Sequence, residues 1–256
     1  MIERAFCLLQ GNDGAFIVNR FDLGVAWQTF NTGSHDGAII NMVKDILDVR
    51  KLHYGNDVTV IDAGANIGPC TVGWGRHMLG WGRVIAFEPQ EWVYYALAGN
   101  VAINNLYNVK ALNIAVSDKS GMMKIPMLNP CKPTNFGGLS LKAQFGDPMK
   151  EQQSVSYDDD SKMMPVHTLA IDDLKMARVD LIKIDVEGME PEALDGAVET
   201  ITRCRPMMFI EHIICGKDPI MSRLKGYEAF EMWGNLLLLH NEDRATEMVK
   251  TRLSPS

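Results

Sequence analysis

The chain is short of cysteine pairs, of positive charge and of long apolar runs, and each shortage excludes a class of protein. Its five cysteines are an odd number without a Cys-x-x-Cys pair, so neither a disulfide framework nor a zinc site is predicted. The net charge of -7 argues against a nucleic-acid partner, because binding a phosphate backbone needs a surplus of Lys and Arg. No stretch reaches membrane-spanning length, and residues 1–10 hold too short an apolar run for a signal peptide. We therefore expect a soluble, cytoplasmic protein.

Residues 60–68, Val-Ile-Asp-Ala-Gly-Ala-Asn-Ile-Gly, join an apolar strand to a glycine turn that opens a helix. Gly64 and Gly68 allow the backbone to turn tightly and to approach a ligand, while the first N–H groups of the helix point into the same crevice. The next strand, 83–87, ends at Glu88, where a carboxylate can accept hydrogen bonds from a ribose diol. This order of strand, turn, helix, strand and acid predicts a nucleoside cofactor.

The details of the turn favour S-adenosylmethionine (SAM) over a dinucleotide. A dinucleotide fingerprint has glycine at its first, third and sixth positions. Counted from Gly64, these positions hold Gly64, Asn66 and Pro69, so only the first matches. Asp62 precedes the turn and is expected to face the crevice, where an acid suits a cationic sulfonium ligand. An NAD-linked oxidoreductase is the alternative that this comparison disfavours.

The apolar pattern is that of an α/β protein with a doubly wound, mostly parallel sheet. Runs typical of strands alternate with longer amphipathic segments typical of helices, which predicts parallel strands joined by helices. The expected strands are 58–62, 83–87, 109–116, 179–185 and 207–212, and the expected helices are 36–52, 67–79, 90–105 and 191–203. A hairpin of 226–233 and 236–239, with a Gly234-Asn235 turn, should add an antiparallel pair at one edge, as methyltransferases do.

The chain divides into three parts around one core. Residues 1–56 form an N-terminal extension and a covering helix, which Ser34 is expected to cap. Residues 57–240 form the cofactor-binding domain. Inside it, the polar segment 129–161 is either a lid over the substrate or a solvated loop. Residues 241–256 form a charged tail with no evident chemistry.

Five segments, taken in order, resemble the FkbM family of SAM-dependent methyltransferases; they are residues 60–68, 87–89, 100–104, 115–118 and 182–188. The likeness spans roughly 57–240 and implies a Rossmann-like class I methyltransferase domain. The family chiefly methylates hydroxyls of sugars and polyketide-like natural products, so the resemblance implies O-methylation of a small-molecule or glycan hydroxyl. Two features depart from the family pattern: Met189 stands where a smaller residue is common, and the segment 129–161 matches nothing in the family.

The resemblance also implies the residues that bind the cofactor. The methionine end of SAM would be surrounded by the turn residues Gly64, Ala65, Asn66 and Gly68, with Asp62 near its amino group. Glu88 would hold the ribose hydroxyls. Val116 and Ser117 would flank the adenine, with a backbone N–H on a ring nitrogen.

The catalytic groups are expected at the carboxyl ends of two neighbouring strands, next to the cofactor crevice. Methyl transfer to an alcohol needs alignment of the acceptor and removal of its proton, by a base or by a metal that acidifies the hydroxyl. Lys183 and Asp185 share one face of a strand, and the next strand ends at Glu211 and His212. The candidates are therefore Lys183 paired with Asp185 or Glu211, His212 as a base, and Asp185 with Glu211 as ligands of Mg²⁺.

Each of these residues also has a purely structural interpretation. Lys183 could belong to an ion pair that orders the turn, and His212 could simply be hydrogen-bonded. Glu187 and Glu190 suit the N-terminal end of the next helix, and His35 with Asp36 could either reach the cofactor or begin the covering helix. A non-catalytic binding module that keeps the methyltransferase fold is therefore a further alternative. The pattern does not predict an oligomeric state.

Overall fold

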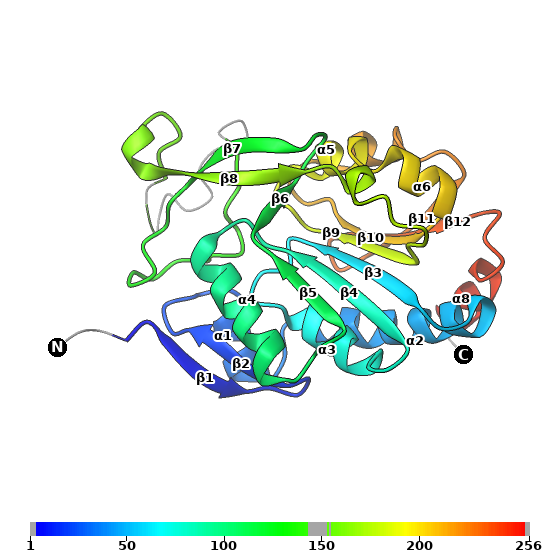
Figure 1. Ribbon diagram of the computed structural model, residues 1–256, viewed down its shortest axis with the longest axis horizontal. Helices are drawn as coiled ribbons and strands as arrows, with labels where there is room; N and C mark the ends of the chain where they lie inside the picture. Colours follow the sequence, from blue (N-terminus) through cyan, green and yellow to red (C-terminus); the bar gives the residue numbers. More distant parts are fainter. Residues whose placement is uncertain (1–3, 143–152, 154, 254–256) are drawn as a thin grey trace.

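A seven-stranded sheet forms the centre of the computed structural model, which describes residues 4–142, 153 and 155–253. Its strand order is β11-β12-β10-β9-β3-β4-β5 (Figure 1). The strands are β3 (Val58–Ala63), β4 (Gly82–Phe87), β5 (Val109–Leu112), β9 (Leu181–Ile184), β10 (Met207–Glu211), β11 (Tyr227–Met232) and β12 (Asn235–His240). The chain leaves β3 first towards β4 and β5 and later towards β9 and β10. Ligands of such sheets bind at this reversal, beyond the carboxyl ends of the strands.

The sheet is parallel except at the C-terminal hairpin, which confirms the predicted fold class. Strand β12 runs antiparallel to both β10 and β11, whereas β3, β4, β5, β9 and β10 pair in parallel. The turn of this hairpin lies one residue earlier than predicted. Trp233 and Gly234 both have positive φ, at 51° and 76°, so that Met232 pairs with Asn235. Two central residues of this kind give a turn whose twist matches that of the strands.

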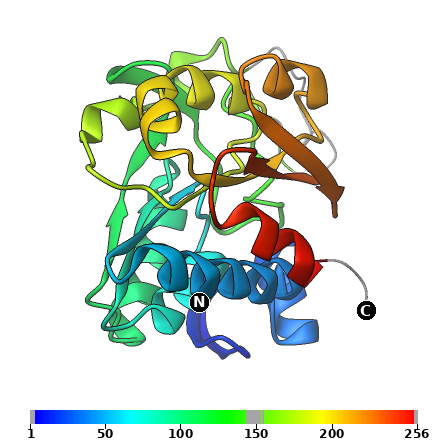
Figure 2. The same ribbon diagram turned by 90° about the vertical axis from the view of Figure 1, so that its right-hand side faces the viewer.

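Helices cover both faces of the sheet, so its central strands are buried throughout. One face carries α2 (Gly37–Tyr54), α3 (Pro69–His77) and α8 (Thr246–Leu253), and the other carries α5 (Glu190–Asp195), α6 (Val198–Cys204) and α7 (Lys217–Met221) (Figure 2). Alternate residues of β3 supply the two cores: Val58 and Val60 pack with the first group, Ile61 and Ala63 with the second. No helix among the described residues is long and apolar enough to cross a bilayer.

Two predicted elements are each divided in the structure. The expected strand 109–116 is split into β5 and β6 (Ile114–Val116), because Asn113 leaves the sheet and donates its amide to the carbonyls of Glu88 and Pro89. Strand β6 joins a second sheet, in the order β6-β8-β7, with β7 (Gly121–Pro126) and β8 (Met163–Leu169). The expected helix 191–203 is split into α5 and α6 at Gly196, where a Cβ atom would stand 2.1 Å from the Ser117 carbonyl oxygen.

The N-terminal extension packs against the domain through helix α4 (Glu91–Ile103). It consists of a hairpin of β1 (Phe6–Gln10) and β2 (Ala15–Asn19) followed by α1 (Val25–Thr32). The Asn100 amide in α4 bonds to the Ile17 backbone, which fixes β2 in place. The prediction that Ser34 caps the covering helix is wrong. Helix α2 follows Asp36 and has no side-chain cap, and the Ser34 hydroxyl instead faces the Asp13 carboxylate.

The segment expected to be a charged tail packs onto the domain over its described residues. Helix α8 lies beside α2 (Figure 2), and Val249 is buried in the same core as α2 and β12. Just before α8, Asp243 accepts a hydrogen bond from the buried Arg50 guanidinium, which also binds Asp180. This ion-pair network lies at the amino ends of the strands, on the side of the sheet away from the predicted ligand crevice.

Candidate functional site

The turn after β3 has a backbone that only glycine can form at its first position. Gly64 has a φ of 77°, and a Cβ atom there would stand 1.7 Å from the Asp185 carbonyl oxygen at the end of β9. The N–H groups of Gly64 and Ala65 donate to the Phe87 carbonyl at the end of β4. Because the turn is held between these two strand ends, its outer side stays open towards a ligand. Gly68, with a φ of 90°, begins α3 against Leu97.

A cavity of about 240 Å³ opens above this turn, at the carboxyl ends of β3, β4, β9 and β10. Its wall is formed by the starts of α1 and α2, the glycine turn, β6, the ends of β4, β9 and β10, and the loop described up to residue 142. Its polar lining comprises His35, Asp36, Asn66, Glu88, Gln90, Asn135, Lys183, Asp185, Glu187 and Glu211. Most of the predicted cofactor-binding and catalytic residues therefore line this one cavity.

Glu88 is oriented by two backbone N–H groups. Its Oε2 accepts from Asn66 at 3.0 Å and its Oε1 from Gln90 at 2.9 Å, and the residue is 4% exposed. Burial raises the pKa of Glu88 to about 7, although these two hydrogen bonds lower it. Each carboxylate oxygen can accept a further hydrogen bond. Glu88 is therefore a fixed acceptor at the rim of the cavity, where two neighbouring hydroxyls can meet it.

The other predicted cofactor residues divide into those that line the cavity and those that support it. Gly64, Ala65, Asn66 and Val116 line it, whereas Gly68, Asp62 and Ser117 do not. Ser117 donates its N–H to the Leu169 carbonyl, so that this N–H is already engaged within the second sheet. Of the two residues expected beside the adenine, only Val116 lines the cavity.

Asp62 lies beneath the turn and is fully buried rather than facing the crevice. Its Oδ2 accepts from the Thr71 hydroxyl at 2.5 Å, and its Oδ1 has no hydrogen-bond partner among the described residues. The nearest cation is Lys183 Nζ, 3.7 Å from Oδ1. Burial raises the pKa of Asp62, against the lowering effects of Lys183 and Thr71. Asp62 can therefore act on a ligand only through Lys183 and the start of α3.

Lys183 pairs with Asp185, one of its two predicted partners. Its Nζ lies 3.0 Å from Asp185 Oδ2 and 3.4 Å from the Gly64 carbonyl oxygen. Burial alone lowers the pKa of Lys183, but Asp185 and Asp62 outweigh it and raise the pKa well above its ordinary value. Lys183 is the single lysine or arginine that lines the cavity within the described ranges. It is a permanent cation that holds the Asp185 side chain and the glycine turn together.

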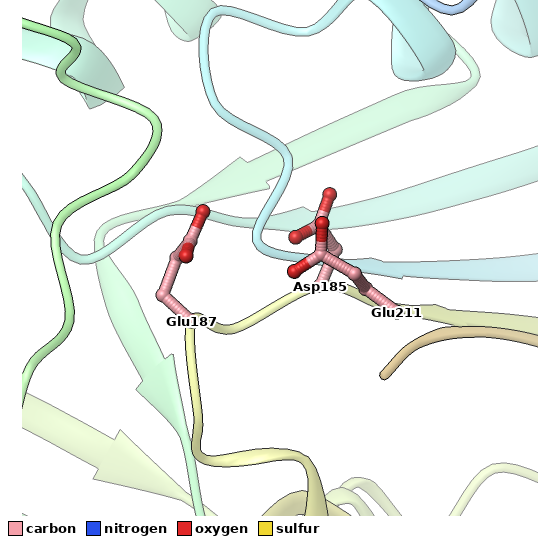
Figure 3. Close-up of side chains that lie close together, drawn as sticks. All are labelled: Asp185, Glu187 and Glu211. Atoms are coloured by element: carbon pink, nitrogen blue, oxygen red, sulfur yellow. The ribbon is translucent and has the colours of Figure 1, made fainter. Parts of the chain in front are cut away.

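Three carboxylates converge at the ends of β9 and β10 (Figure 3). Asp185, Glu187 and Glu211 each offer an oxygen within 4.8 Å of the others. Burial, with the charge of Asp185, raises the pKa of Glu187 to about 9 and that of Glu211 to about 8. Glu190 is not part of this group, because its Oε1 accepts from the Val186 and Gly188 N–H groups and so shapes the turn. The group can bind hydroxyls or a cation.

His212 is not brought to the cavity, in contrast to the role predicted for it. Glu211, the last residue of β10, lines the cavity, whereas His212, the first residue after that strand, does not. The His212 N–H donates to the Gly234 carbonyl in the hairpin turn, and its imidazole interacts with Glu231 of β11.

His35 and Asp36 line the cavity at the start of α2, as one of their two interpretations expected. Nδ1 of His35 lies 3.0 Å from Oδ2 of Asp36. Burial alone raises the pKa of Asp36, but His35 and Lys183 outweigh it and leave the pKa below its ordinary value. No spacing motif in the sequence indicates that this pair lies near the ends of β9 and β10.

The described part of the loop 129–161 contributes to the cavity wall. Gly137, Gly138 and Leu139 line it, and the Gln90 amide donates to the Phe136 carbonyl at 2.7 Å. The glycine pair in this loop was visible in the sequence, whereas the contribution of Gln90 was missed. The rest of the lid prediction, over residues 143–152 and 154, lies outside the described residues.

Comparison with known proteins identifies the family. The Methyltransferase FkbM domain matches residues 62–233 of the chain. The chain belongs to the FkbM methyltransferase family. This confirms the resemblance found in the sequence and favours methyl transfer over the NAD-linked alternative.

Individual relatives are more distant. Methyltransferase sdnD of Sordaria araneosa is 28% identical over 159 residues, which is 55% of this chain and 60% of that protein. The crystal structure of Methyltransferase FkbM from Methylobacillus flagellatus KT has a TM-score of 0.49 at 17% identity, covering 75% of this chain and 48% of that one. A SAM-dependent O-methyltransferase from Thermotoga maritima has a TM-score of 0.41 at 12% identity, covering 88% and 66%. The match to the Sordaria relative leaves about two fifths of that protein unaccounted for.

Proposed function

We propose that the protein is a SAM-dependent O-methyltransferase that methylates a hydroxyl of a saccharide or another small natural product. The observation that carries this proposal is the direct contact of Glu88 with the Gly64 turn, through the Asn66 N–H, at the wall of a cavity that lies at the reversal of a doubly wound sheet. Family membership supports methyl transfer as the reaction, and the cavity supports SAM as the donor.

Bound SAM supplies a methyl group on a positively charged sulfur. Gly64, Ala65 and Asn66 would surround its amino-acid end, because their backbone lies open to the cavity. Glu88 would accept the two ribose hydroxyls, and Val116 would contact the adenine. The family resemblance also assigns Asp62, Gly68 and Ser117 to the cofactor. These three residues do not line the cavity and would support the site from outside it.

The charge of the cavity wall favours a cationic cofactor. Five acidic side chains line it, and Lys183 is the single lysine or arginine among its described residues; the acids are Asp36, Glu88, Asp185, Glu187 and Glu211. The ionised members of this group stabilise a sulfonium and repel the pyrophosphate of a dinucleotide. Glu187 and Glu211, whose pKa values burial raises to about 9 and about 8, add little negative charge at neutral pH.

The acceptor hydroxyl would lie against Asp185, Glu187 and Glu211. Most of the rate of an in-line methyl transfer can come from alignment of the acceptor with the methyl carbon. A carboxylate accepts a hydrogen bond from a hydroxyl, and a protonated carboxyl can also donate one. A group with both kinds suits the several hydroxyls of a saccharide. Lys183 contributes by keeping Asp185 at a fixed position.

The same three carboxylates make a magnesium-dependent route the second candidate. Mg²⁺ prefers oxygen ligands, and Glu187 adds a third one to the predicted pair of Asp185 and Glu211. Chelation decides between the routes. Loss of methyl transfer in EDTA, restored by added Mg²⁺, supports the metal, whereas activity that survives thorough chelation rejects it.

Calorimetric titration with SAM and with S-adenosylhomocysteine (SAH) tests the cofactor assignment. We expect Glu88→Ala to weaken both about 10- to 100-fold, because hydrogen bonds to a charged acceptor contribute about 1.5–3 kcal/mol. Glu91→Gln is the matched control, since Glu91 bonds Tyr95 on the surface of α4 and does not line the cavity. Equal affinities in Glu88→Ala and wild type would contradict the assignment.

The acceptor is best found by transfer of a labelled methyl group onto a panel of sugars, glycolipids and phenols. Transfer to any of them excludes a non-catalytic module. A glycan acceptor and a cytoplasmic location remain predictions from the sequence.

A further inference from the structure

Two consecutive side chains, His35 and Asp36, converge on one point of the cavity wall. Neighbouring residues of a strand or helix normally point apart. Here they meet because Asp36 has a φ of 58° and a ψ of 27°, in the left-handed region that a non-glycine residue adopts at some cost. The result is the 3.0 Å contact between His35 Nδ1 and Asp36 Oδ2, with the two side chains 24% and 29% exposed.

The Asp36 side chain also does not cap helix α2, although it stands at the N-cap position. It is the residue just before α2, where an aspartate usually accepts a hydrogen bond from the first N–H groups of the helix. No side chain caps α2, so the carboxylate binds the imidazole instead. A strained backbone and an unused cap at the wall of a ligand cavity indicate a functional constraint rather than a local preference.

The free edge of the imidazole is available to a substrate. Since Nδ1 is bound to Asp36, the second ring nitrogen, Nε2, remains as a proton acceptor, and it makes no hydrogen bond to any described residue. A second acid, Asp22, interacts electrostatically with His35. Asp22 is itself fixed, because its carboxylate accepts from the Gly24 and Ala26 N–H groups at 3.0 and 2.8 Å. Asp36 and Asp22 can therefore both stabilise a positively charged His35 imidazole.

The dyad faces the same space as the acceptor-binding group. His35 and Asp36 line the same cavity as Lys183 of β9 and Glu211 of β10, and Asp36 interacts electrostatically with both of these residues. Asp185 is already engaged by Lys183. An acceptor hydroxyl in this cavity can therefore meet both the carboxyl groups and the imidazole.

We infer that His35 is the general base of methyl transfer and that Asp36 is its positioning residue; this rests on the proposed function. The acceptor oxygen bonds to the methyl carbon while its proton passes to His35 Nε2. The bond from that carbon to sulfur breaks, and its electron pair remains on the sulfur. Asp36 and Asp22 stabilise the resulting imidazolium, which then releases its proton to solvent.

The first test compares His35→Gln and His35→Ala with wild type at saturating SAM and acceptor. We expect kcat to fall about 10²- to 10⁴-fold, the usual contribution of a positioned base. The Kd of SAH should change less than about threefold, and added imidazole should restore part of the rate of His35→Ala. His167→Gln is the matched control, because His167 is exposed on β8 and does not line the cavity.

The second test is independent of turnover. Nitrogen NMR of the free protein should show the neutral His35 ring with its proton on Nδ1, and Asp36→Asn should shift this tautomer while leaving the Kd of SAH unchanged. The inference is overturned if wild-type His35 carries its proton on Nε2. It is also overturned if His35→Gln retains kcat within threefold, or if the variant loses SAH affinity as strongly as activity.

Failure of this inference can be told from failure of the proposed function. A wild-type protein that binds neither SAM nor SAH would refute the function itself. A wild-type protein that binds SAH and transfers methyl groups, with an unchanged rate in His35→Gln, would refute the role of His35 alone.

Discussion

Burial of Glu88 makes the folded protein less stable at high pH, and Glu88→Gln should remove that effect. The folded protein releases the Glu88 proton at a pKa of about 7, because burial disfavours the charged form, whereas the ordinary value is 4.5. Between these values the folded state binds more protons than the unfolded state. The stability contributed by Glu88 is therefore fully present below pH 4.5 and is lost as the pH rises through 7.

The size of the effect follows from the two pKa values. Their difference corresponds to about 3 kcal/mol, at about 1.4 kcal/mol per pH unit. A glutamine cannot titrate, so the variant lacks this loss. Its single acceptor oxygen leaves one of the N–H groups of Asn66 and Gln90 without a partner, which costs about 1 kcal/mol at every pH. The stability of Glu88→Gln relative to wild type should thus rise by about 3 kcal/mol between pH 4.5 and 8.5.

Urea unfolding of the ligand-free proteins across this pH range measures the prediction. Glu91→Gln, on the surface of α4, should follow the wild-type profile. Parallel profiles for wild type and Glu88→Gln would refute the reasoning, since they would mean that Glu88 titrates alike in the folded and unfolded states. Under the proposed function, this gain in stability would accompany the loss of the acceptor for the ribose hydroxyls.

Two further predictions concern the scaffold. Gly64→Ala should lower the free energy of unfolding by more than about 3 kcal/mol, because the new Cβ would meet the Asp185 carbonyl. Gly80 also has a left-handed backbone, but a Cβ there would meet no other atom, so Gly80→Ala should lower it by only about 1 kcal/mol. Arg50→Ala should cost about 3 kcal/mol, because it leaves the buried Asp243 without an ion pair, whereas Asp180 keeps its ion pair with Arg178. Arg223→Ala, which breaks an exposed pair, should cost at most about 1 kcal/mol. Urea unfolding checks both, and equal losses within either pair would contradict the argument.

The fold was predictable because local and long-range preferences agree along most of the chain. The mostly apolar runs at β3, β9 and β10 reflect burial on both faces, and the glycine turn follows β3 in the sequence itself. The breaks were not predictable, because distant contacts cause them. Asn113 ends β5 by bonding to the carbonyls of Glu88 and Pro89, and Gly196 divides a helix where it meets Ser117.

The site was predictable where it depends on strand ends and not where it depends on side-chain direction. Glu88 and Asp185 lie in the cavity because each directly follows a central strand. Asp62 also lies at the end of its strand, but the packing of α3 places it beneath the turn, against Thr71. The contribution of His35 depends on one left-handed residue at Asp36, and no periodic pattern in a sequence reveals such a conformation.

A crystal structure of the protein with SAH tests the central claim most directly. The account predicts the ribose hydroxyls on Glu88, the adenine beside Val116 and the amino-acid end along the Gly64 turn. SAH bound elsewhere, or a crevice filled by the protein's own side chains, would contradict it.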